Sequence, residues 1–319
     1  MDHPVFSALI PVVLLIVTGF VAGKRRWIRA EAVRDLSNLV FLVLIQALLF
    51  RTMSTVHIER LDFKPVALYF AVAGALFGGL VLLRGTTSRA AVEALAAIFS
   101  NTVMIGVPLV SLAYGEAGLV LLFTLISLHA LILLTLATVV LELLTAREAA
   151  QRADSDVPHL WATVGLAVRN AIIHPVPLPI IAGLLFAQTG LTLPAVVDRP
   201  LQLLGAAFGP VALVLVGVTL AQSAIGRHLR GALAISGVKM LLHPLLMAGA
   251  GLLFGLRGLP LSVMVLAAAL PIGANVFLFS QRYQVAQGLI TASVAASTLL
   301  GLGSLSVVMW LLAAFVPQH

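Results

Sequence analysis

The chain has 319 residues, of which 61% are hydrophobic and only 10% charged, so it cannot cover a water-soluble surface and the bilayer is its expected solvent. It contains 0 cysteines, which excludes disulfides, cysteine-ligated zinc and iron–sulfur clusters. The formal net charge of +7 comes from basic residues in short loops between apolar runs, and these suit topology signals and anionic lipid rather than nucleic acid.

Hydropathy predicts an all-α polytopic membrane protein with roughly ten transmembrane helices, each near the ~20 residues that a bilayer requires. Lys24, Arg25 and Arg26 directly follow the first apolar run, and no basic residue precedes it. We therefore expect a retained first helix with its N-terminus outside. The predicted spans are residues 5–22, 33–50, 65–83, 91–113, 117–142, 170–189, 200–221, 231–255, 260–281 and 286–315.

The polar stretch around residues 146–159 divides the spans into two sets of five. We expect a first repeat over 1–144, a cytoplasmic loop over 145–169 and a second repeat over 170–319. An odd number of spans per half inverts the second half relative to the first. Weak matches support an inverted repeat. Gly19 falls on Gly183 at a shift of about 164 residues, and with a slip of one Pro108 falls on Pro271.

The distribution of Lys and Arg predicts the orientation in the membrane. Most basic residues fall in loops on one side, which we assign to the cytoplasm. An even number of spans then places both termini outside an inner (plasma) membrane.

Two spans carry residues that interrupt helices near their middle. The fourth reads FSNTVMIGVPLVSL and the ninth reads ALPIGANVFLF. Packing kinks are the alternative, but matched breaks in both halves favour a site where half-helix N-termini and side-chain amides bind a small carboxylate. The residues are Asn101, Gly106 and Pro108 in the fourth span and Pro271, Gly273 and Asn275 in the ninth.

The chain resembles the auxin efflux carrier family over roughly residues 5 to 315. The resemblance rests on the strings NTVMIGVP and LPIGANVFLFSQRY, on GPVALVLVGVTL at Gly209–Leu220 and on Lys-x-x-x-x-Pro at Lys239–Pro244. That family includes bacterial carriers of malate- and malonate-like acids and the plant PIN exporters. The resemblance implies two inverted five-helix repeats that cross at broken helices four and nine near the midplane. It also implies a scaffold domain and a transport domain that move as an elevator. One departure is Gln46 in IQALLF, where the family usually has proline.

Several polar residues lie inside predicted spans. Lys239 either snorkels to the headgroups or neutralises an anionic substrate, and the resemblance favours the second role. His243 shares its helix face, and either bonds within the bundle or relays protons. For His129 we expect an interhelical hydrogen bond. Asn38 and Gln46 either line a cavity or bond between helices. Close-packing faces are expected at Gly74-x-x-x-Gly78 and Gly251-x-x-x-Gly255.

These features predict a secondary transporter of a small organic anion, with no cofactor and no metal. A channel is one alternative, and an intramembrane enzyme using Ser236 and Lys239 as a dyad is a weaker one. The nearest string to a Walker A motif, at Gly19, has the wrong spacing, so ATP-driven transport by this chain alone is not expected. The coupling ion, the direction of transport and a homodimer are left open.

Overall fold

The structure is a computed structural model, and it describes residues 4–57, 59, 61–151, 177–223 and 226–316. Apart from one isolated bridge between Ser100 and Ile272, the regular structure in these ranges is helical. The helices are α1 (Pro4–Lys24), α2 (Ala32–Leu39), η1 (Val40–Leu44), α3 (Ile45–Met53), α4 (Lys64–Leu83), α5 (Ser88–Ile98), η3 (Thr102–Gly106), α6 (Val107–Gln151), α8 (Pro177–Gln188), α9 (Ala195–Gln222), η4 (Gly226–His228), α10 (Leu229–Gly237), η5 (Val238–Leu242), α11 (His243–Leu253), α12 (Gly258–Ala269), α13 (Asn275–Tyr283) and α14 (Gln287–Phe315).

The chain is a multi-pass membrane protein. By length and composition, 6 helices of the described part can cross a membrane. Large apolar side chains such as Leu83 and Leu253 stand exposed at the surface, as expected where lipid is the solvent. The membrane-length helices are Ala32–Met53, Lys64–Leu83, Thr102–Glu148, Ala195–Gln222, Leu229–Leu253 and Gln287–Phe315.

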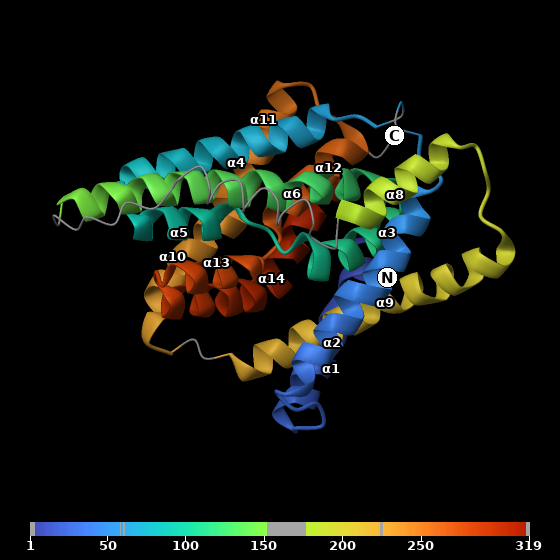
Figure 1. Cartoon of the computed structure of the whole chain (residues 1–319), viewed down its shortest axis with the longest axis horizontal. Helices are drawn as coiled ribbons and strands as arrows, with labels where there is room; N and C mark the ends of the chain where they lie inside the picture. Colours follow the sequence, from blue (N-terminus) through green and yellow to red (C-terminus); the bar gives the residue numbers. More distant parts are fainter. Residues whose placement is uncertain (1–3, 58, 60, 152–176, 224–225, 317–319) are drawn as a thin grey trace.

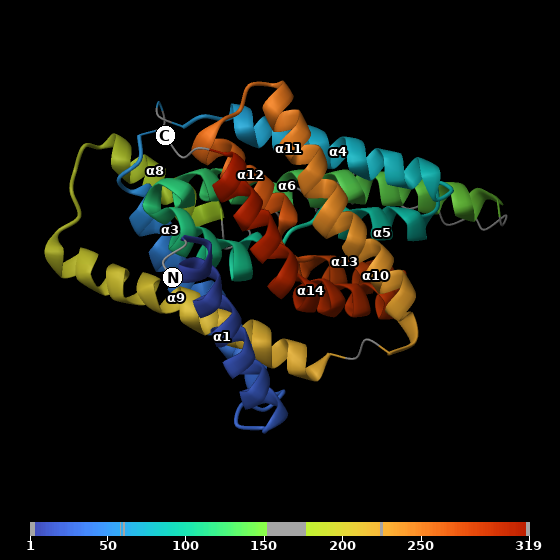
Figure 2. The same ribbon diagram turned by 180° about the vertical axis from the view of Figure 1, so that it is seen from behind.

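The helices form two groups that lie side by side (Figures 1 and 2). In the first group, α1 and α2 pack on α9, and α3 packs on both α8 and α9. In the second group, α4 packs on α5 and α11, α5 on α6, α12 on α6 and α11, and α14 on α10 and α13. We call these the α1–α9 group and the α4–α14 group. Both groups combine helices from the two halves of the sequence.

The backbones of α1 and α9 touch where two glycines meet. A Cβ atom on Gly19 would lie 1.9 Å from the carbonyl oxygen of Val214, and one on Gly217 would lie 2.0 Å from that of Ile16. Of the two glycine faces expected elsewhere, the one on α4 is wrong, since a Cβ on Gly74 or Gly78 would meet nothing within 4 Å. The other holds only at Gly251, where a Cβ would lie 2.4 Å from Leu261 Cδ1. Gly255 follows the end of α11 with φ 78° and meets nothing within 4 Å.

The interruption of the predicted fourth span lies earlier than its proline suggests. Helix α5 ends at Ile98 and η3 begins at Thr102, so the break is Phe99–Asn101. Pro108 instead lies just after the π-helical turn η3, inside the helical segment that begins at Thr102, and that segment continues through it. The non-helical backbone of Gly115 (φ 60°, ψ −152°) lies between the predicted fourth and fifth spans and divides α6 there.

The polar loop predicted over 145–169 also needs a correction. Helix α6 continues to Gln151, so residues 145–151 are helical. The rest of that loop lies outside the described residues, as does the start of the predicted span 170–189, whose described part is α8.

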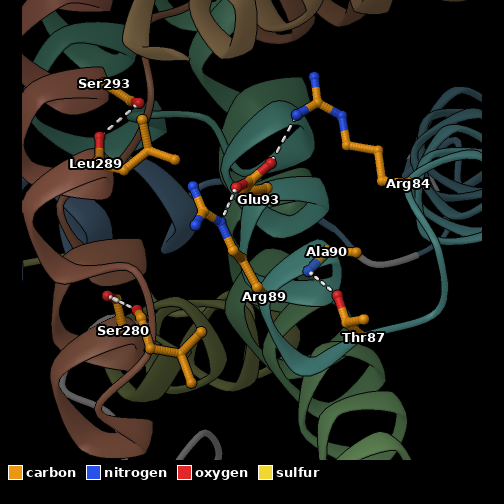
Figure 3. A network of polar contacts seen from close by, with 9 residues as sticks. Arg84, Thr87, Arg89, Ala90, Glu93, Ser280, Leu289 and Ser293 are labelled. Carbon is orange, nitrogen blue, oxygen red and sulfur yellow. Dashed lines mark hydrogen bonds and ion pairs between the residues drawn. The ribbon is translucent and has the colours of Figure 1, made fainter. Parts of the chain in front are cut away.

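The ends of α4 and α5 are tied by a cluster of charges (Figure 3). Glu93 is only 7% exposed, and it binds Arg84 at 2.7 Å and Arg89 at 2.8 Å. Thr87 caps α5, since its hydroxyl accepts from the Ala90 N–H at 3.1 Å. These contacts fix the helix that leads into the first break.

We predict that Gly19→Ala destabilises the protein and that Gly74→Ala does not. The added methyl of Gly19→Ala meets backbone atoms of Val214, which cannot move aside without shifting α9. Such overpacking costs about 1–3 kcal/mol. The matched change on α4 enters open space. Thermal unfolding of the two purified variants measures the difference, and equal midpoints would contradict the close contact.

Candidate functional site

Two breaks in helices, Phe99–Asn101 and Leu270–Ala274, lie against each other. The Asn101 N–H donates to the Pro271 carbonyl at 2.8 Å, and the Gly273 N–H donates to the Phe99 carbonyl at 3.0 Å. This pair of bonds makes the antiparallel bridge between Ser100 and Ile272. Backbone groups released from a helix need partners when no water is available, and here each break supplies them to the other.

A third element completes the pairing of the second break. Ser297 of α14 accepts a hydrogen bond from the Ile272 N–H at 3.0 Å and donates one to the Val294 carbonyl at 3.0 Å. Its side chain is fully buried. Sequence reasoning missed this role, because one serine in an apolar helix usually bonds to its own backbone.

The predicted polar and small residues shape the crossing of the two breaks. The Asn101 side chain caps η3 by accepting from the Met104 N–H at 3.2 Å. A Cβ on Gly106 would lie 2.7 Å from Leu270 Cδ1, and one on Gly273 would lie 2.9 Å from Phe99 Cδ1. Both glycines therefore make room for the opposite break.

A cavity of about 350 Å³ lies beside the crossing. Its wall includes three of the predicted site residues, Asn101, Gly273 and Asn275, together with Asn38 from α2 and His129 from α6. No Asp, Glu, Lys or Arg of the described chain lines it. The remaining predicted site residues, namely Gly106, Pro108, Pro271, Lys239, Gln46 and His243, are not in its wall.

Two helical segments begin at this cavity. The η3–α6 segment starts at Thr102, and α13 starts at Asn275. The first N–H groups of a helix have no partner within it and carry partial positive charge, which makes them donors to anions. With the amides of Asn38 and Asn275 nearby, the cavity offers donors to a small anion without offering a full charge.

Gln46 does not reach the cavity. Its side-chain amide donates to the Phe41 carbonyl at 2.8 Å, within its own helix and across the π-helical turn η1. Pro108 lines a different cavity, of about 470 Å³, where it faces Gly209 of α9.

Lys239 does not snorkel. It is 0% exposed, and its ammonium donates to the Ala268 carbonyl near the end of α12. A cation suits the C-terminal end of a helix. Ser236 donates instead to the Ser293 carbonyl at 3.4 Å, so the two members of the suggested Ser–Lys dyad have different partners.

Aromatic and histidine side chains pack behind the crossing. The Tyr69 hydroxyl and the Ser100 hydroxyl are hydrogen-bonded at 3.0 Å. The Tyr69 ring lies 6.0 Å from that of His129 and 5.4 Å from that of His243. His129 Nε2 and both ring nitrogens of His243 are buried without a hydrogen-bond partner. The interhelical bond expected for His129 is thus not made through Nε2.

Comparison with known proteins gives a match over nearly the whole chain. The family described as "Membrane transport protein" matches residues 4–309. A "Putative malonate transporter" from Rhizobium meliloti (strain 1021) is 30% identical over 312 residues, covering 95% of this chain and 94% of that protein.

More distant matches extend to plants and archaea. A "Probable auxin efflux carrier component 1b" from Oryza sativa subsp. japonica is 30% identical over 139 residues, which is 42% of this chain and 25% of that protein. An "Uncharacterized transporter" from Methanothermobacter thermautotrophicus is 23% identical over 306 residues, which is 94% of this chain and 95% of that protein.

We predict that Ser297→Ala lowers the free energy of unfolding by about 1–3 kcal/mol, because it leaves the buried Ile272 N–H without an acceptor. Ser306→Ala on the same helix is the matched control. Its hydroxyl only donates to Leu302 within α14. Thermal unfolding of both variants tests the bond, and a Ser297→Ala protein as stable as the control would show that Ile272 does not need it.

Proposed function

Because this chain belongs to the membrane transport protein family that includes the auxin efflux carriers, we propose that it is a secondary carrier of a small carboxylate. The family is one of transporters, so the chain is not an enzyme. The Rhizobium meliloti relative makes malonate the first substrate to test.

The observation that carries this proposal is the uncharged cavity at the crossing of the two breaks. Its volume of about 350 Å³ falls in the range of small-molecule sites. Two helical segments direct their N-termini at it from opposite halves of the sequence. Two partially positive ends suit a substrate with two carboxylates, such as malonate. Asn101, Gly273 and Asn275 line the site, and Gly106 and Pro271 shape the crossing of the two breaks beside it.

We further propose that the chain is an inverted repeat. Gly19 of α1 meets the backbone of Val214 in α9, and Gly183 of α8 meets the backbone of Phe50 in α3. The two contacts are equivalent, because the same shift of about 164 residues carries Gly19 onto Gly183 and Phe50 onto Val214. The bridge between Ser100 and Ile272 is itself symmetric, since each break donates one bond and accepts one. Contacts that repeat in this way support ten spans in two five-helix repeats.

The bridge also argues against the pairing of Pro108 with Pro271. A two-fold axis between the breaks exchanges Ser100 with Ile272, which corresponds to a shift of about 172 residues. The shift at the breaks therefore exceeds the shift of about 164 residues at the glycine contacts by about eight. The second repeat holds about eight more residues than the first between those contacts and its break. Pro108 has no equivalent proline in the second half under this alignment.

An elevator-type movement is the mechanism that fits this arrangement. Both breaks and Ser297 belong to the α4–α14 group, so the hydrogen bonds of the crossing lie within one group. The cavity wall, in contrast, also takes Asn38 and Pro177 from the α1–α9 group. Sliding one group past the other would change the access to the cavity while the crossing stays intact.

For the orientation, we predict that single cysteines at Ala30 and Arg230 react with a membrane-impermeant thiol reagent from the cytoplasm. Cysteines at Glu59 and Thr192 should react from outside. All four positions are exposed, and the chain has 0 cysteines of its own. The excess of Lys and Arg on the first side gives this direction. Labelling of Ala30 and Glu59 variants from one face would refute the proposed topology.

For the site, we predict that Asn275→Leu abolishes malonate binding without loss of folding, because Leu is well tolerated in a span and Asn275 lines the cavity. Gln281→Leu on the same helix is the control. Gln281 is exposed and is not in the cavity wall. Malonate-dependent thermal stabilisation of purified protein reports binding. Wild-type stabilisation in Asn275→Leu would remove Asn275 from the site. Ionic currents far above carrier turnover would instead indicate a channel.

A further inference from the structure

Four titratable side chains from three spans meet behind the cavity. They are Tyr69 of α4, His129 of α6, Lys239 of η5 and His243 of α11, and we call them the polar cluster. Each is at most 2% exposed. The ring distances of 5.4 Å and 6.0 Å from Tyr69 to the two histidines make these three side chains contiguous, and Lys239 lies four residues before His243 on the same span.

The polar cluster has unused hydrogen-bonding capacity. Lys239 and Tyr69 have partners in Ala268 and Ser100. In contrast, the Nε2 atom of His129 and both ring nitrogens of His243 have none. An unpartnered polar group in a dry interior costs about 1–3 kcal/mol. The three nitrogens belong to the two histidines that pack against Tyr69, and they give the polar cluster hydrogen-bonding capacity that its described contacts do not use.

His129 is the member that joins the polar cluster to the cavity. It alone of the four side chains is in the cavity wall. Its ring packs edge-on against the ring of Phe99, with 4.5 Å between the ring centroids. Phe99 and Asn101 belong to the first break, so a ligand held there lies next to the imidazole. The other groups around His129 are Phe70 and Tyr69 from α4, together with Lys239 and His243.

The charges around His129 decide when it can hold a proton. Among the described residues no acidic side chain lines the cavity, and Lys239 is the cationic side chain of the cluster. An imidazolium here would have no counter-charge in the empty site, and burying an unpaired charge is costly. A bound carboxylate supplies that counter-charge. Histidine is also the side chain whose charge changes most readily near neutral pH.

We infer that His129 takes up a proton when the carboxylate binds in the cavity, so that the carrier moves the anion together with a proton. The proton comes from the aqueous side to which the cavity is open, and it leaves with the anion on the other side. Neutral imidazole becomes imidazolium on binding and returns to neutral on release, so no other reactant is needed. This inference rests on the proposed function, because it requires a carboxylate substrate.

Calorimetric titration of the full-length wild-type protein with malonate, in two buffers of different ionisation enthalpy, counts the protons taken up on binding. We expect about one proton per malonate at a pH where free histidine is neutral. Apparent affinity should fall about tenfold per pH unit over that same range, because proton and anion binding are linked. Malonate binding with no proton uptake would overturn the inference.

Variants locate the proton. His129→Gln should abolish the uptake and weaken malonate binding by about tenfold, while His243→Gln, which changes a histidine outside the cavity wall, should keep the uptake. Uptake that survives His129→Gln and disappears in Lys239→Gln would overturn the assignment to His129. If a variant does not fold, the wild-type proton count still decides whether a proton is bound. A wild-type protein that does not bind malonate at all would count against the proposed substrate instead.

Discussion

The need to pair every backbone polar group in hydrocarbon governs this structure. A helix meets that need by itself, and a broken helix does not. Here the two breaks meet it together, through the bonds between Asn101 and Pro271 and between Gly273 and Phe99. The rest follows from this exchange. Glycines are required where the breaks touch, a serine from α14 takes the remaining N–H, and two helix N-termini are left pointing at one cavity.

The same constraint explains why no charged side chain of the described residues lines the cavity. A fixed cation or anion in its wall would need a permanent partner, whereas amides and helix dipoles are satisfied by water when the site is empty. Lys239 is kept behind the crossing, where the carbonyl of Ala268 accepts its hydrogen bond, and it does not line the cavity. Of the polar cluster only His129 lines the cavity, so the amides that recognise the anion and the imidazole that balances its charge share one wall.

The sequence predicts much of this fold and part of the site. Apolar runs near membrane length predict the helices, because hydrocarbon leaves the chain few alternatives, and three residues of the predicted motifs, Asn101, Gly273 and Asn275, line the cavity. Pro108 misled, since the break lies before it at Phe99–Asn101 and the helix continues through the proline. Ser297 and His129 were missed or misread, because their roles depend on which helices lie next to them. Gly19 and Gly74 look alike in sequence, yet only Gly19 faces another backbone.

The exchange between the breaks uses main-chain atoms, and this has an evolutionary consequence. Side chains at Ser100 and Ile272 can be replaced without removing the bonds that their neighbours make, so long as the glycine at 273 is kept. Residues around the cavity are then free to drift while the framework persists. Descendants of one ancestor can acquire different cargoes without inventing a new architecture.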